Sequence, residues 1–234
     1  MANHFRDRKR NEKQPVILIV PGIDNSGPDH WQTRWEARRD DCRRVDLGMW
    51  DKPHRNTWVN KLNLAIHRAD GPVILVAHSL GCLTVAWWAE YEQPGFGNPV
   101  VGALLVAPPD VERPGPDERL ARFGACPRSP LPFPGILAAS RSDPYCTFRR
   151  ALSLARDWNC RFVDCGDAGH INADSGLGDW REGERLLNRM ISDHAWAAEA
   201  GYARLTGAAS QRPARGKVSE WGAKSARDQV PGLW

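Results

Sequence analysis

No run of apolar residues in this 234-residue sequence approaches the roughly 18 that a membrane-spanning helix requires. Residues 1–14 are polar and basic and lack the apolar segment of a secretory signal, so we expect none. The six cysteines include no C-x-x-C pair and no pairing with closely spaced histidines, which favours free thiols over a disulfide framework or a zinc site. Together these absences predict a cytoplasmic protein with no membrane span and no bound metal.

A concentrated basic surface is also missing, although the formal net charge is +4. Residues 1–13 and residues 205–234 each carry five Lys or Arg and two Asp or Glu, so the excess positive charge lies near the two ends. The sequence between them is slightly acidic. We therefore expect the protein not to bind nucleic acid.

The length and composition predict one globular domain. A chain of 234 residues can bury one hydrophobic core, and its hydrophobic fraction of 41% and charged fraction of 26% are ordinary for soluble proteins. We expect a basic flexible leader at 1–14, the domain at 15–204 and a disordered tail at 205–234. The tail is rich in Gly, Ala, Ser, Arg and Lys and shows no periodicity.

Segments of strand length, several of them continuous apolar runs, alternate with helical patterns along the chain. The expected strands are 16–20, 43–47, 73–77, 100–107, 136–139 and 161–164, and the expected helices are 29–39, 56–69, 80–91, 145–158 and 179–194. Runs without polar alternation are typical of strands covered on both faces, as in a parallel sheet. The order predicts a compact α/β fold of about six mainly parallel strands with helices on both faces.

A short turn with a serine at its apex follows the apolar run at 73–77. The turn reads Ala77-His78-Ser79-Leu80-Gly81, which matches the nucleophile-elbow pattern G-x-S-x-G except for alanine in place of the first glycine. Alanine keeps the smallness that this turn needs, because strand and helix approach closely there. A serine in a tight turn is more often a cap or turn residue, but an apolar strand before it and an apolar helix after it favour a nucleophile.

A carboxylate and a histidine follow this serine in the chain order that α/β-hydrolases use. Asp143 comes just after the predicted strand at 136–139, and His170 lies in a glycine-containing loop after the strand at 161–164. Each would lie beyond the carboxyl end of a strand, so we predict a triad of Ser79, His170 and Asp143. Asp143 could instead be only a helix cap. The rival carboxylates are Asp164, Asp167 and Asp174; the first lies within a strand, and the others are too near His170 in sequence.

Backbone N–H groups are the expected oxyanion donors. We predict the N–H of Leu80 and that of Ile23, with Asp24 as the alternative to Ile23. Asp24 and Asn25 either line a pocket or are ordinary loop formers. The other pocket candidates are Trp31, Trp50, His78, Asn172 and Trp180, of which His78 is either structural or pocket-lining.

The segment from 108 to 134 holds eight of the eighteen prolines, so little regular structure is expected beyond a turn of helix. It is either a rigid surface loop or a wall over a pocket. The sequence does not distinguish a lid from a fixed loop here.

Several short blocks in order resemble the RBBP9/YdeN family of small serine hydrolases. They are Val20-Pro21-Gly22, His30-Trp31-Gln32-x-x-Trp35, Ala77-His78-Ser79-Leu80-Gly81-Cys82, Ala107-Pro108-Pro109-Asp110, Ser142-Asp143-Pro144-Tyr145 and Gly169-His170-Ile171-Asn172-Ala173. The resemblance covers roughly residues 15–195. It implies a compact α/β-hydrolase fold and the same triad, with esterase or peptidase activity on an unspecified target, and some relatives are described through protein binding.

The leading interpretation is a serine hydrolase that cleaves a carboxylic ester or a small amide through an acyl-enzyme, with neither metal nor cofactor. One alternative is an interaction protein that retains the fold without the chemistry. Another is an acyltransferase that uses the same triad. The expected partner is a small-molecule ester or amide, and a protein partner is not readable from the sequence.

Overall fold

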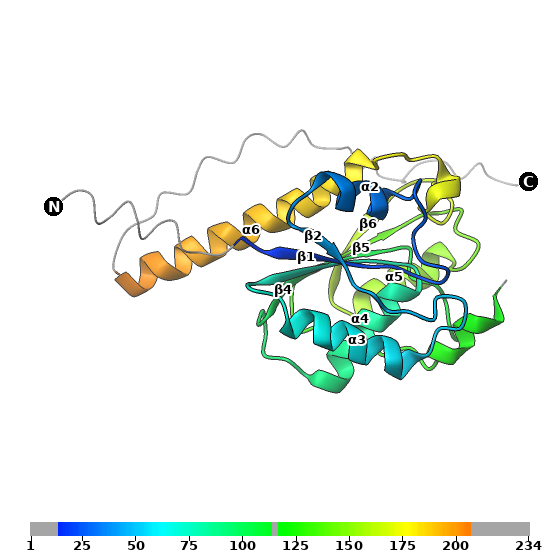
Figure 1. The fold of residues 1–234 in the computed structure, drawn as a ribbon, viewed down its shortest axis with the longest axis horizontal. Helices are drawn as coiled ribbons and strands as arrows, with labels where there is room; N and C mark the ends of the chain where they lie inside the picture. Colours follow the sequence, from blue (N-terminus) through cyan, green and yellow to red (C-terminus); the bar gives the residue numbers. More distant parts are fainter. Residues whose placement is uncertain (1–13, 114–116, 207–234) are drawn as a thin grey trace, which may run out of the picture. The chain divides into compact units, whose positions relative to one another are not determined.

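A parallel sheet forms the centre of the computed structural model, which describes residues 14–113 and 117–206. The strands are β1 (Val16–Val20), β2 (Cys42–Arg44), β3 (Val73–His78), β4 (Val100–Val106), β5 (Gly135–Ala139) and β6 (Cys160–Asp164). They form a six-stranded sheet in the order β2-β1-β3-β4-β5-β6, and every neighbouring pair is parallel (Figure 1). The predicted α/β fold with about six parallel strands is confirmed.

Helices connect the strands close to the predicted positions. They are α2 (Trp31–Arg38), α3 (Arg55–His67), α4 (Leu80–Glu92), α5 (Phe148–Asp157) and α6 (Arg181–Thr206), with short 3₁₀ segments η1 (Glu118–Phe123) and η2 (Ala173–Ser175). α5 begins later than predicted because the side chain of Thr147 caps it by accepting a hydrogen bond from the backbone N–H of Arg150. No described helix is both long enough and apolar enough to span a bilayer.

The last helix is longer than predicted. The sequence indicated an end near His194, where the apolar stripe stops, whereas α6 runs to Thr206. Its final residues include several alanines, which have the highest intrinsic helix propensity. Contacts within the chain group residues 1–194 into one unit and residues 195–234 into another. Residues 1–13 of the predicted leader at 1–14 and residues 207–234 of the predicted tail at 205–234 lie outside the described residues.

The strands alternate their side chains between two apolar layers, as a sheet covered on both faces requires. One layer contains Leu18, Leu75 and Leu105 with residues of α3, α4 and α5. The other contains Ile19, Val76 and Leu104 with α2 and the first part of α6. Figure 1 shows α2 on one side of the sheet and α3 and α4 on the other.

Tryptophan side chains tie the helices to the loops around the sheet. Five indole N–H groups donate to backbone carbonyls outside the β-strands and α-helices: Trp31 to Ile171, Trp35 to Asp179, Trp58 to Gly48, Trp87 to Phe123 and Trp158 to Pro127. Buried indoles generally need such an acceptor. Each of these five indoles therefore contributes a hydrogen bond in addition to its packing.

Candidate active site

The turn between β3 and α4 has the backbone conformation of a sharp elbow. Ser79 sits at φ 54° and ψ −127°, outside the regions that non-glycine residues usually occupy. Its backbone N–H donates to the carbonyl of Val106 at 2.9 Å, which fixes the turn to the neighbouring strand. The turn therefore projects the Ser79 side chain beyond the carboxyl edge of the sheet.

Two segments approach the Ser79 turn so closely that each needs a glycine: Gly22 in the loop after β1 and Gly81 in the first turn of α4. A Cβ on Gly81 would lie 2.3 Å from the carbonyl oxygen of Val20, and a Cβ on Gly22 would lie 2.7 Å from the Cβ of Ser79. Such distances are shorter than atoms tolerate. The loop after β1 is therefore pressed directly against the elbow, as the small-residue pattern predicts.

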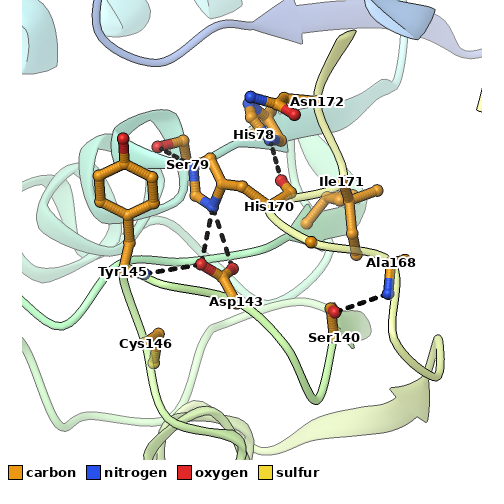
Figure 2. A network of polar contacts seen from close by, with 12 residues as sticks. His78, Ser79, Ser140, Asp143, Tyr145, Cys146, Ala168, His170, Ile171 and Asn172 are labelled. Carbon is orange, nitrogen blue, oxygen red and sulfur yellow. Dashed lines mark hydrogen bonds and ion pairs between the residues drawn. The ribbon is translucent and has the colours of Figure 1, made fainter. Parts of the chain in front are cut away.

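Three side chains from separate loops form a continuous set of hydrogen bonds at this edge (Figure 2). The Nε2 of His170 lies 2.9 Å from the Oγ of Ser79. The Nδ1 of His170 lies 3.0 and 3.1 Å from the two carboxylate oxygens of Asp143. The side chains of His170 and Asp143 are only 10% and 3% exposed. This is the geometry in which an imidazole can take a proton from a serine while a carboxylate orients it.

The rival carboxylates lie elsewhere. Asp164 pairs with Arg141 and accepts from the N–H of Gly166, Asp167 is exposed, and Asp174 lies within hydrogen-bonding distance of Asn172. Among the described residues only Asp143 bonds the Nδ1 of His170. It is held there by the backbone N–H of Tyr145, which donates to Oδ1 at 2.9 Å.

The loop that carries His170 is anchored by two side chains that the sequence suggested for a pocket. The Nε2 of His78 donates to the carbonyl of His170 at 2.9 Å, and the indole N–H of Trp31 donates to the carbonyl of Ile171 at 2.8 Å. Both donors are buried. Figure 2 shows His78 beside this loop, with a dashed line to the backbone oxygen of His170.

Buried histidines continue from this loop into the layer between α2 and the sheet. The ring of His30 packs edge-on against that of His78 at 4.7 Å between centroids. Burial, with the charge of Arg44 as the next cause, lowers the pKa of His30 to about 4. Burial also lowers the pKa of His78 well below its usual value. Both rings are therefore neutral at pH 7.

We expect acid to destabilise the protein through His30. Its pKa is about 4 when folded and about 6.5 when unfolded, so between these values the unfolded chain binds the extra proton. The contribution of His30 to the free energy of unfolding is therefore fully present above pH 6.5. Roughly 3 kcal/mol of it is lost as the pH falls to 4. His30→Asn retains an acceptor for the Gln32 N–H at the α2 N-cap. In urea unfolding experiments, the free energy of unfolding of this variant will depend less on pH between 7 and 4.5 than that of the wild type.

The exposed His67 provides the control for this experiment. His67→Asn will keep the pH dependence of the wild type. An equal pH dependence in wild type and His30→Asn would contradict the assignment of the acid sensitivity to His30.

The backbone N–H groups of Ile23 and Leu80 lie beside Ser79, and neither has an acceptor among the described residues. The N–H of Asp24, the alternative donor, is occupied by the carbonyl of Trp50 at 3.0 Å. The geometry therefore favours Ile23 over Asp24 as the partner of Leu80. The carboxylate of Asp24 faces outward and receives both Nη atoms of Arg119 at 2.9 Å.

The other pocket candidates are dispersed. Trp31 and Trp180 are 1% and 4% exposed and belong to the apolar layer with α2, so their placement gives no support to an open acyl pocket. Trp50 is half-buried and packs on Trp58. Asn25 accepts from Arg44, and Asn172 lies in the capping box of η2.

Two further residues near the site were not predicted from the sequence. The ring of Tyr145 lies 4.4 Å from that of His170, between centroids. Its place two residues after Asp143 was the available signal. Arg119, from the proline-rich segment, also bonds the carbonyl of Asp51. Leu120 and Phe123 of the same segment are buried in the core, so part of this segment packs against the domain.

The cysteines do not offer a competing nucleophile. All six are free, and burial raises the pKa of the Cys146 thiol, which lies near Asp143, to about 12. Thiols need to ionise to react. Across residues 14–113 and 117–206, no group of three or more His, Cys, Asp or Glu side chains could hold a metal ion.

Comparison with known proteins places these features in context. The sequence profile of a family described as serine hydrolase matches residues 17–189. A YdeN-like hydrolase from Pectobacterium atrosepticum is 32% identical, with 82% of this chain and 98% of the other covered and a TM-score of 0.67. No curated protein matches the sequence.

Two other solved structures share the fold. The ydeN gene product of B. subtilis is 21% identical, with 76% of this chain and 99% of the other covered and a TM-score of 0.62. Est1E from Butyrivibrio proteoclasticus is 13% identical, with 79% and 91% covered and a TM-score of 0.57. At these identities the likeness concerns the fold alone.

Proposed function

Because this chain belongs to the serine hydrolase family that includes YdeN-like hydrolases, we propose that it hydrolyses a carboxylic ester or a small amide through an acyl-enzyme formed on Ser79. The observation that carries the proposal is the hydrogen-bonded series from the Oγ of Ser79 through His170 to Asp143. Hydrolysis is the activity of the family, whereas the residues and the substrate class are our assignment.

In the proposed first step, the Oγ of Ser79 attacks the carbonyl carbon and its proton passes to the Nε2 of His170. The carboxylate of Asp143 accepts the Nδ1–H, which keeps Nε2 unprotonated and stabilises the imidazolium that forms. His170 then donates the proton to the leaving alcohol or amine. A water molecule then gives a proton to His170 and attacks the acyl-enzyme, and His170 returns this proton to the Oγ of Ser79 as the acyl–oxygen bond breaks and the acid leaves.

The negative charge of the tetrahedral intermediate needs two donors that point at one position. The N–H groups of Ile23 and Leu80 are the candidates, because they flank Ser79 and are not used by other described groups. Gly22, which contacts Ser79, brings the first of these donors close. Each such donor contributes on the order of 10²–10³ in rate in comparable hydrolases.

A fluorophosphonate probe tests the nucleophile directly, because it reacts covalently only with an activated serine. We expect labelling of the wild type and none of Ser79→Ala, together with loss of hydrolysis of short-chain p-nitrophenyl esters. The exposed Ser129 supplies the control, since Ser129→Ala will be labelled like the wild type. Labelling that persists in Ser79→Ala would refute the assignment, and a wild type inert to both reagents would favour the interaction-protein alternative.

A further inference from the structure

We infer that Trp31 and His78 are positioning residues that hold the catalytic histidine in place through two consecutive backbone carbonyls. This inference rests on the proposed role of His170 as the base. His78 binds the carbonyl of His170 itself, and Trp31 binds the carbonyl of the next residue, Ile171. The two donors come from different elements, the end of β3 and the first residue of α2.

The held loop has a conformation that needs external support. Ile171 sits at φ 49°, a left-handed conformation that is strongly disfavoured for a β-branched residue. Gly169, on the other side of His170, sits at φ 55°. Backbone strain of this kind costs about 1–3 kcal/mol and persists only where the surrounding structure imposes it. The hydrogen bonds from Trp31 and His78 act on the peptide groups at this strained position.

The two donors are suited to a fixed role because neither changes its hydrogen-bonding state near neutral pH. An indole N–H can only donate. A carbonyl can only accept, so the Nε2 of His78 carries the hydrogen, and burial holds the pKa of His78 well below its usual value.

His170 has two partners whose distances must be kept at once, Ser79 at 2.9 Å and Asp143 at 3.0 Å. Displacement of a catalytic group by about 1 Å can lower the rate roughly 10²-fold. Loss of either anchoring bond will therefore lower kcat and leave substrate affinity largely unchanged. It moves the base without altering the surface that binds the substrate.

The neighbouring tryptophan on the same helix provides a matched control. Trp31 and Trp35 are both buried, and each donates one indole N–H to a backbone carbonyl, at 2.8 and 2.7 Å. Only the Trp31 acceptor, Ile171, adjoins His170, since the Trp35 acceptor is Asp179. Trp31→Phe and Trp35→Phe thus remove equivalent bonds and keep an aromatic ring at each position.

We expect both variants to lower the urea midpoint to a similar extent, while only Trp31→Phe lowers kcat, by about 10- to 100-fold with KM unchanged. His78 gives an independent test. His78→Gln places an amide donor near the position of Nε2 and will retain more activity than His78→Leu. Equal kcat in Trp31→Phe and Trp35→Phe, after equal stability losses, would overturn the inference.

A spectroscopic readout separates this inference from the proposed function. We expect the Nδ1–H of His170, which is bonded to Asp143, to give a low-field proton resonance without any substrate. We expect this resonance to shift or broaden in Trp31→Phe and to stay unchanged in Trp35→Phe, even if every tested ester proves inert. An unchanged resonance in Trp31→Phe would overturn the positioning role, whereas absence of labelling at Ser79 in a wild type with a normal resonance would overturn only the proposed function.

Discussion

Replacement of Asp143 by asparagine will lower kcat by on the order of 10⁴ while leaving the fold intact, as the equivalent change does in a serine protease triad. The hydrogen bonds at this position explain the size of the effect. The N–H of Tyr145 requires an acceptor at Oδ1, so the amide oxygen of asparagine will occupy that side and its NH₂ group will face His170. The imidazole must then accept at Nδ1 and carry its hydrogen on Nε2, which cannot take the proton of Ser79.

Ester hydrolysis by purified Asp143→Asn measures this effect, and Asp167→Asn is the matched control. Asp167 is exposed and lies in the same loop as His170, so its neutralisation changes the charge near the site without changing a bond to the imidazole. We expect Asp167→Asn to retain activity within about twofold. A loss of less than tenfold in Asp143→Asn would transfer the orienting role to another carboxylate.

Substitution of Gly81 by alanine will have the largest effect on stability. In an ordinary helix this change stabilises by about 1 kcal/mol. Here the added methyl group would lie 2.3 Å from the carbonyl oxygen of Val20 and 2.6 Å from that of Pro21. Backbone oxygens cannot rotate away as side chains do, so β1 and α4 must separate. We expect a loss of at least about 3 kcal/mol in the free energy of unfolding.

The same movement will displace the Ile23 N–H, because Pro21 lies two residues before it. The fraction of Gly81→Ala that still folds is therefore expected to hydrolyse esters more slowly than the wild type. Urea unfolding monitored by circular dichroism, with ester turnover on the same samples, checks both effects. Gly27→Ala is the control, since a Cβ there would meet nothing within 4 Å. A Gly81→Ala variant as stable as wild type would show that the close approach is not as tight as described.

The placement of Ser79, Asp143 and His170 is predictable from the sequence for a physical reason. Ser79 and Asp143 follow continuous apolar runs, which parallel strands covered on both faces produce, and His170 follows the short mixed strand β6. Because parallel strands end at the same edge of a sheet, three side chains distant in sequence are brought together. The chain order alone therefore carries most of the information on which residues meet.

The anchoring of the loop around His170 is not predictable in this way. Trp31 and Trp180 stand beside predicted loops, which suggested a pocket, but apolar rings near loops are equally suited to burial. A hydrogen bond from Trp31 to the carbonyl of Ile171 uses an acceptor that every residue possesses, so no residue type in the loop marks it. The positive φ of Ile171 is likewise not predictable from the sequence, because isoleucine normally avoids this conformation.

The tryptophan ties described above also have a consequence for how the protein can change. Five backbone positions in three connecting segments are held by an indole N–H that donates to a carbonyl rather than to a side chain. The fastening therefore places no demand on the identity of the residue that it holds. Loop residues around the site can be randomised in a library, or diverge between relatives, while each loop remains attached at the same point. The residues that hold these segments in place therefore lie in α2, α3 and α4 and at the end of α5. The residues of the segments themselves can change while the attachment is kept.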